Sequence, residues 1–297
     1  MRDLFKVTIL VFLFPFLSFL SADEHESDRR APMGWLAQNP PLYETMLADP
    51  RKVFYSISYR FFDNAISDNI GAVSLGDHIP FYSWEDVEIF SQKGRLDFSI
   101  QGAAWAIFDF DNKDDIAQII NADYLVGPCL SYRSGKASYR LRLYHTSSHL
   151  GDEYLLANLP GIIRYNPSHE ALDLFASYDL TEALRFYAGL GYIIRSDKNF
   201  SIQPLHTEFG AECRLFGWKS QNVALLYQPF LAMHFRFWED KQWSGDETYL
   251  LGLEISRLDR LGRKLRFYLE YHDGYSVEGQ FSRSKTSYFS MNMGMGF

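Results

Sequence analysis

The chain has 297 residues, of which 47% are hydrophobic and 17% aromatic, and its formal net charge is −8. An acidic chain without a stripe of Lys and Arg lacks the clustered cations that phosphate backbones need, so nucleic acid is not an expected partner. No segment after the first 22 residues offers an uncharged stretch long enough for a transmembrane helix. If the protein enters a membrane, it does so as strands.

The first expected element is an export signal. Two basic residues precede an almost unbroken apolar run from Val7 to Leu20, and the small residues Ser21 and Ala22 follow it. This order is typical of a secretory signal peptide, and the run is too short for a comfortable transmembrane helix. We therefore expect residues 1–22 to be a cleaved signal peptide.

Residues 23–52 differ from the rest of the chain. They are polar, they contain four prolines, and they include a short helix-compatible piece from Leu42 to Ala48. Such a composition is typical of loops and turns. We expect a periplasmic lead-in or a plug here.

From Val53 onward, apolar and polar residues alternate, as in strands whose successive side chains point to opposite faces. Each alternating segment has roughly ten residues, the length that a tilted strand needs to cross a bilayer. An even number of spans leaves both termini on the periplasmic side. The expected spans start near residues 53, 71, 94, 122, 137, 170, 184, 203, 222, 247, 264 and 286.

The expected connections fall into two alternating classes. Short, turn-rich connections, such as 134–136 and 179–183, would be periplasmic, and longer ones, such as 151–169, would be extracellular. Two connections break this pattern. Residues 196–200 give a short outer connection, and residues 80–93 give a long inner one.

The composition of the polar face separates a membrane barrel from a soluble β-sandwich or a lipocalin-like barrel. That face is rich in Gly, Ser, Gln, Tyr and charges of both signs, which suits a crowded lumen better than a water-exposed surface. We expect the charges to form a paired network that fills or narrows the channel, with a selective pore as the alternative. They are Arg60, Arg133, Arg140, Arg142, Arg185, Glu208, Glu212, Arg214, Arg236, Glu254, Arg266 and Glu270.

The last segment carries the strongest signal. Phe289, Met291, Met293, Met295 and Phe297 alternate with small or polar residues. The pattern resembles the terminal strand by which the barrel-assembly machinery recognises its substrates. The sequence thus predicts an all-β protein, an antiparallel transmembrane β-barrel of about 12 strands over residues 53–297, in a bacterial outer membrane.

One cluster indicates chemistry, at the end of the fifth span. His145 and Ser147 lie two residues apart on a strand and therefore share a face, together with Leu141 and Leu143. That face is the one expected to meet lipid. An imidazole beside a hydroxyl can act as its general base when a third polar group orients the ring.

The His-x-Ser pair resembles that of the outer-membrane phospholipase A family, twelve-stranded barrels with this pair on the outer surface and an Asn completing a triad. The resemblance implies Asn158 or Asn166 as the third residue, although Ser148 and His149 follow here where the family has Asn and Gly. A lipid A deacylase uses a similar pair with Glu, which would make Glu153 the third residue.

The phospholipase resemblance also bears on partners and cofactors. It implies outer-membrane lipid as the substrate, it allows a homodimer, and under this hypothesis alone it allows calcium. Otherwise no cofactor is expected.

The longer string Ser-Ser-His-Leu-Gly-Asp-Glu, residues 147–153, resembles a bacterial exported family known only as a domain of unknown function. That resemblance extends over most of the mature chain and supplies no activity.

Two other interpretations of the same residues stay open. His145 can be an interfacial residue and Ser147 the start of a polar loop, in a non-catalytic barrel that is structural or narrowly conducting. A metal site would use His145 and His149 with Asp152 and Glu153. That spacing suits a helix better than a strand end, where residues four apart, such as His145 and His149, lie about 13 Å from each other.

Overall fold

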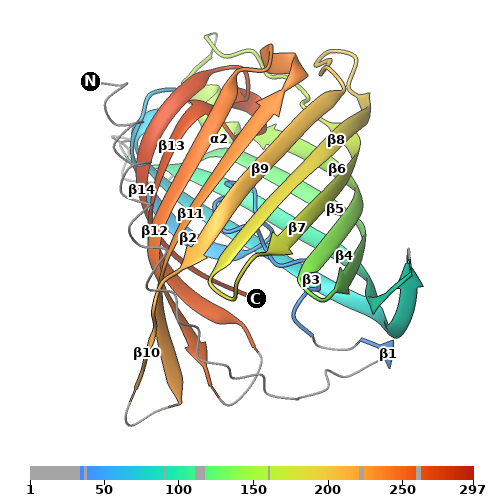
Figure 1. Ribbon diagram of the computed structural model, residues 1–297. Helices are drawn as coiled ribbons and strands as arrows, with labels where there is room; N and C mark the ends of the chain where they lie inside the picture. Colours follow the sequence, from blue (N-terminus) through green and yellow to red (C-terminus); the bar gives the residue numbers. More distant parts are fainter. Residues whose placement is uncertain are drawn as a thin grey trace.

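The computed structural model describes residues 34–36, 39–89, 91–110, 118–159, 161–220, 224–258 and 262–297. The expected signal peptide lies outside the described residues, as does the first part of the expected lead-in. Twelve antiparallel strands close into a barrel in these described parts (Figure 1). The all-β prediction and the predicted strand number are confirmed.

The barrel strands follow one another around the wall in chain order, and β14 pairs with β2 while β3 pairs with β4. Short hairpins make this order possible, as at Gly135, whose φ of +54° is accessible to glycine without strain. The barrel strands are β2 (Tyr55–Asp63), β3 (Ser67–Ile89), β4 (Gln92–Asp109), β5 (Gln118–Ser134), β6 (Ala137–Leu150), β7 (His169–Asp179), β8 (Leu184–Ser196), β9 (Leu205–Arg214), β11 (Leu225–Trp238), β12 (Gly245–Arg257), β13 (Lys264–Tyr275) and β14 (Lys285–Gly296).

The two ends of the barrel differ. The end at which β2 starts and β14 ends is called the terminal end here, and the opposite end the loop end. Among the described residues, three short helices lie at the loop end, α2 (Asp152–Ala157), η2 (Glu239–Lys241) and η3 (Gly279–Phe281). In the described part of the chain no helix is long and apolar enough to cross a membrane.

The apolar faces of the strands point outward. Met291 is 59% exposed and Leu190 is 66% exposed, whereas the inward-facing Glu254 and Arg266 are buried. A soluble barrel would bury its leucines and expose its charges. The observed arrangement is instead that of a wall built to contact lipid.

Two strands are longer than the sequence analysis predicted. Residues 80–93, expected as a long connection, belong almost entirely to β3 and β4, which continue as a paired ribbon past the barrel at the terminal end (Figure 1). Register shifts after Pro80 and Trp84 interrupt the alternation there, which explains why the period-two pattern was lost in the sequence. The two-residue strand β1 (Gly34–Trp35) pairs with this ribbon, and the two-residue strand β10 (Trp218–Lys219) pairs antiparallel with β11.

Residues 39–54 lie inside the barrel. Tyr43 and Met46 pack against Phe175 and Tyr187 of the inner wall, while residues 47–48 pack in a second cluster with Phe54. The helix-compatible piece 42–48 forms bends and turns rather than a helix, because its backbone is fixed by contacts with the wall. We call residues 39–54 the plug.

Candidate functional site

Strand β6 carries the predicted pair on its outward face. Leu141 and Leu143 are exposed, and the intervening Arg142 and Tyr144 line the lumen. The same alternation continues toward the loop end, so that Ser148 is buried inside while His145 and Ser147 point outward. The predicted pair therefore lies on the outer wall, next to the exposed Leu141 and Leu143 and closer than they are to the loop end.

The imidazole of His145 is held by a residue of the neighbouring strand. His145 pairs with Glu170 in the β6–β7 register, and its Nδ1 atom lies 3.0 Å from Oε1 of Glu170. A carboxylate at Nδ1 fixes that nitrogen as the proton-bearing one and leaves Nε2 as the free base. The pair is half exposed on the lipid-facing wall.

A third strand completes this polar group. Arg195 of β8 donates from Nε to Oε2 and from Nη2 to Oε1 of Glu170, each over 2.8 Å. The side chain of Arg195 is 76% exposed, so the guanidinium lies at the surface and the carboxylate lies between it and His145. A two-point contact of this kind fixes both the position and the charge of Glu170.

Ser147 is the next outward residue after His145, opposite Tyr124 of β5. No hydrogen bond joins Ser147 to His145 in the described residues. The Cα atoms of same-face neighbours lie about 7 Å apart on a strand, and hydrogen bonds between a nucleophile and its base are often loose in unliganded sites. His145 and Ser147 are therefore neighbours on the outward face of β6, and no hydrogen bond joins them in the part of the chain that the structure describes.

The residues that the sequence analysis offered as a third member lie elsewhere. Asn158 ends α2, where its Nδ2 donates to the carbonyl oxygen of Tyr154 at 2.8 Å. Asn166 donates to Asp197, and Glu153 lies in the first turn of α2. In the described chain none of them is hydrogen-bonded to His145. Sequence reasoning missed Glu170, because its contact with His145 depends on the register between β6 and β7, which an 18-residue connection separates in the chain.

The metal candidates His149 and Asp152 lie on either side of the end of β6. The ring of His149 lies outward, 6.0 Å from that of Tyr124, and Asp152 begins α2. No group of three or more His, Cys, Asp or Glu side chains within the described residues is arranged to hold a metal ion.

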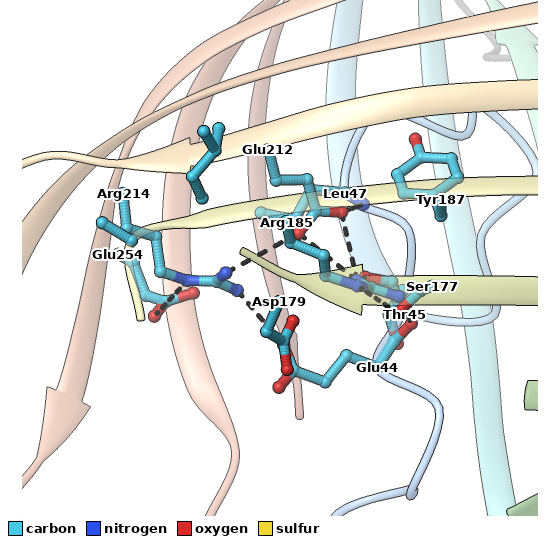
Figure 2. Close-up of polar contacts among 12 residues, drawn as sticks. Glu44, Thr45, Leu47, Ser177, Asp179, Arg185, Tyr187, Glu212, Arg214 and Glu254 are labelled. Atoms are coloured by element: carbon cyan, nitrogen blue, oxygen red, sulfur yellow. Dashed lines mark hydrogen bonds and ion pairs between the residues drawn. The ribbon is translucent and has the colours of Figure 1, made fainter. Parts of the chain in front are cut away.

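The lumen forms a second candidate region, crossed by the plug at the terminal end. Figure 2 shows Arg185 of β8 pointing at the plug, where it donates to the carbonyl oxygens of Glu44 at 2.8 Å and Thr45 at 3.2 Å. Glu212 of β9 pairs with Arg185 at 3.4 Å and accepts a hydrogen bond from the backbone N–H of Leu47 at 2.8 Å. These bonds tie the plug to the wall.

The other lumen charges that the sequence analysis named are also paired. Their partners come from the wall, the plug and the loop between β13 and β14, so the network holds all three together. The pairs are Arg60 with Glu278, Arg133 with Asp179, Arg140 and Arg142 with Asp173, Arg214 and Arg266 with Glu254, Arg236 with Asp246, Glu208 with His234, and Glu270 with Lys52.

The loop between β13 and β14, residues 276–284, covers the lumen at the loop end and is called the lid. Glu278 of the lid is buried and pairs with Arg60 at 2.9 Å. Burial alone would raise the pKa of Glu278, but Arg60 and Arg51 outweigh it and lower that pKa to about 2. Arg51 of the plug also binds Asp123 and the carbonyl oxygen of Val277, which connects plug and lid.

Comparison with known proteins gives the family. A family profile described as "Protein of unknown function (DUF1207)" matches residues 27–297. The chain belongs to the DUF1207 family. The family profile carries no activity, and no curated protein sequence matches the chain.

Solved structures with the same fold are outer-membrane barrels. The chain is similar to outer membrane phospholipase A from Escherichia coli, with a TM-score of 0.54 and 11% identity over 86% of this chain and 93% of that one. It is also similar to the Salmonella typhi outer membrane phospholipase dimer with bound calcium, with a TM-score of 0.55 and 11% identity over 92% and 94%. At this identity the likeness establishes the fold, and this DUF1207 chain is an outer-membrane β-barrel.

Proposed function

We propose that the protein is a serine hydrolase that cleaves acyl esters of membrane lipid on the outer wall of the barrel. Ser147 is the nucleophile, His145 the general base, and Glu170 the residue that orients the imidazole. The observation that carries the proposal is the 3.0 Å contact between His145 and Glu170 on the lipid-facing side, beside Ser147. It supports a triad assembled from two neighbouring strands.

The position suits a lipid ester. Outer-membrane barrels have short periplasmic turns and longer extracellular loops, so the loop end is the extracellular one. Below the pair, Leu143 and Leu172 are exposed to hydrocarbon. Above it, Arg195 offers a cation at the height of polar headgroups. An ester between acyl chain and headgroup would lie at the level of Ser147.

In the reaction, Nε2 of His145 takes the proton of the Ser147 hydroxyl as its oxygen attacks the ester carbonyl. Collapse of the tetrahedral intermediate breaks the ester bond, and the leaving alcohol takes the proton from His145. Water then attacks the acyl-serine, with His145 again as base, and releases the fatty acid. Glu170 stabilises the imidazolium that forms in both steps.

The fold likeness adds support, because both solved structures named above are outer membrane phospholipases. Dimer formation and calcium binding, both seen in the Salmonella typhi phospholipase, are secondary proposals for this chain. Sedimentation of the protein in detergent with calcium or a chelator would test them separately from hydrolysis. The assembly machinery is expected to recognise the terminal strand that ends in Phe297.

The experiment uses the full chain in vesicles that contain a fluorogenic phospholipid. The wild type should release fatty acid, and Ser147→Ala should be slower by roughly 10³-fold or more. The matched control is Ser148→Ala, because Ser148 is the next residue but faces the lumen, where it donates to Asn121. Equal rates for wild type and Ser147→Ala would refute the proposal.

A second candidate is a closed, non-catalytic barrel. It is favoured by the two-point contact of Arg195 with Glu170, which satisfies the carboxylate without any substrate, and by the paired charges across the lumen. The same assay separates the two, since this candidate gives no release above that of empty vesicles.

A further inference from the structure

Arg51 of the plug is in direct contact with the lid. Its Nε donates to the carbonyl oxygen of Val277 at 2.8 Å, and its guanidinium lies 4.0 Å from the carboxylate of Glu278. Arg51 also pairs with Asp123 of β5, which accepts a hydrogen bond from the backbone N–H of Gly279 at 3.0 Å. Across the described ranges, every hydrogen bond and ion pair between plug and lid belongs to Arg51.

Cavities lie beside this contact. The guanidinium of Arg51 lies 5.0 Å from the ring centroid of Trp105, and both residues line one cavity toward β2 and β3 and another toward β6, β7 and β11. Val277 and Gly279 of the lid line the second cavity. Because open space flanks the contact, the polar bonds of Arg51 rather than close packing hold plug and lid together.

The groups that Arg51 binds are buried. Asp123 is 3% exposed and Glu278 is 2% exposed. Glu278 has a second partner in Arg60, but without Arg51 the carbonyl oxygen of Val277 would lose its hydrogen bond and Asp123 would lose its cation. A buried polar group that loses its partner destabilises the conformation that buries it. The closed lid is therefore more stable while the plug is in place.

The same segment is fixed to the wall at the opposite end of the lumen. Arg185 and Glu212 hold it there, with Glu212 accepting the backbone N–H of Leu47 (Figure 2). Between Leu47 and Arg51 the plug is a series of turns. The N–H of Asp49 donates to the carbonyl oxygen three residues earlier at 3.2 Å, and Oδ1 of Asp49 accepts the N–H of Arg51 at 2.8 Å. A shift of Leu47 is therefore passed on to Arg51.

We propose that plug and lid form one gate, in which displacement of the plug at the terminal, periplasmic end releases the lid at the extracellular end. Arg51 transmits the movement. While the plug is in place, both ends of the lumen are closed. When the plug shifts, Arg51 leaves Val277 and Asp123, and the lid opens. The gate acts on the lumen and does not depend on the proposed hydrolysis at the outer wall.

Hydrogen exchange of the lid, residues 276–284, in the full chain in detergent micelles tests the proposal. Arg185→Ala removes bonds between plug and wall at the terminal end and no contact of the lid. It should lower the protection of the lid at least about tenfold, as should Arg51→Gln. Each variant is first checked for the heat-dependent gel mobility of a folded barrel. Glu212→Gln, which weakens the same anchor, takes the place of Arg185→Ala if that variant does not fold.

The matched control is Arg142→Gln. Arg142 lines the same cavity as the lid, but its hydrogen bonds go to Asp173 and Gln101 of the wall. Its replacement should leave the protection of the lid unchanged. Unchanged lid protection in a folded variant of the terminal anchor, or an equal loss in Arg142→Gln, would overturn the proposal.

The reverse experiment follows from the reciprocity of coupling between two sites. Glu278→Gln weakens the bond of the lid to Arg60 and should therefore speed exchange in plug residues 44–49, which lie toward the other end of the lumen. Plug residues as protected in Glu278→Gln as in the wild type, beside a loosened lid, would show that plug and lid move separately and would contradict a single gate.

Discussion

The Nδ1 atom of His145 lies 3.0 Å from Oε1 of Glu170, across two paired strands and on the side of the barrel that carries exposed leucines. A His–Glu contact that faces lipid is not needed to fill a lumen or to close a sheet. It orients an imidazole at the position where Ser147 follows on the same face, and this arrangement underlies the proposed hydrolysis.

Replacing Glu170 by Gln tests the orienting role. The amide can still accept a hydrogen bond but cannot stabilise the imidazolium, so phospholipid hydrolysis should fall by roughly 10²–10⁴-fold, while KM changes little. Thermal stability should change little, because the pair is half exposed. As a control, Arg195→Gln keeps the carboxylate and should lower the rate much less. Equal losses for both variants would contradict the assigned roles.

How much of this site the sequence could predict depends on the strand in question. The alternation along β6 correctly placed His145 with Leu141 and Leu143 and opposite Arg142, because the two-residue period is set by covalent geometry. The contact with Glu170 depends on how β6 and β7 are aligned after the 18-residue connection between Leu150 and His169. Nothing local in the sequence fixes that alignment.

A plug was one of the two expectations for residues 23–52, but its irregular path and the long ribbon could not be predicted, for a similar reason. Leu42 and Leu47 have spacing compatible with a helix, yet both are buried against the inside of the barrel in an irregular segment. Packing against the inside of the barrel therefore outweighs the local preference of this segment for a helix. In β3, the register shifts after Pro80 and Trp84 disrupt the alternation by which the other strands could be located.

Closure of the lumen by the plug predicts electrical behaviour. In planar bilayers the wild type should show no steady current, because Arg185 and Glu212 tie residues 44–47 across the channel. Arg185→Ala removes the bonds to Glu44 and Thr45 and should produce intermittent openings. The control is Arg195→Ala, an outward arginine on the same strand, which should stay silent. A large, steady wild-type conductance would contradict the plug.

Strands β5 and β6 approach each other closely at Gly127, so a larger residue there should lower the stability of the barrel. A Cβ atom on Gly127 would overlap the carbonyl oxygen of Leu143, whereas one on Gly102 of β4 would meet its nearest neighbour, the carbonyl oxygen of Leu125, at 3.9 Å. Gly127→Ala should therefore destabilise the barrel by about 1–3 kcal/mol, and Gly102→Ala should be close to neutral. Urea unfolding followed by tryptophan fluorescence measures both. Equal midpoints would contradict the predicted contact.

Acid should loosen the lid. The pKa of Glu278 is lowered from 4.5 to about 2 by Arg60 and Arg51, against the opposing effect of burial. A lowered pKa in the folded state means that the carboxylate stabilises the fold above about pH 4.5, and that this contribution is lost as the pH falls toward 2. The loss is on the order of 3 kcal/mol.

Hydrogen exchange of residues 276–284 measures this loosening. Exchange, corrected for its intrinsic pH dependence, should increase between about pH 5 and pH 2 in the wild type. In Glu278→Gln it should already be fast at pH 7 and should show a much smaller pH dependence. A lid that is equally protected at both pH values in the wild type would contradict the role assigned to this ion pair.

Covalent trapping of the nucleophile tests the central claim most directly. The full chain in phospholipid vesicles is treated with an alkyl fluorophosphonate, which reacts with activated serines, and the modified peptide is identified by mass spectrometry. Our account predicts a single adduct on Ser147, strongly reduced in His145→Ala and in Glu170→Gln and unchanged in Ser148→Ala. An unmodified Ser147 in the folded wild type, or an adduct that persists equally in His145→Ala, would contradict it.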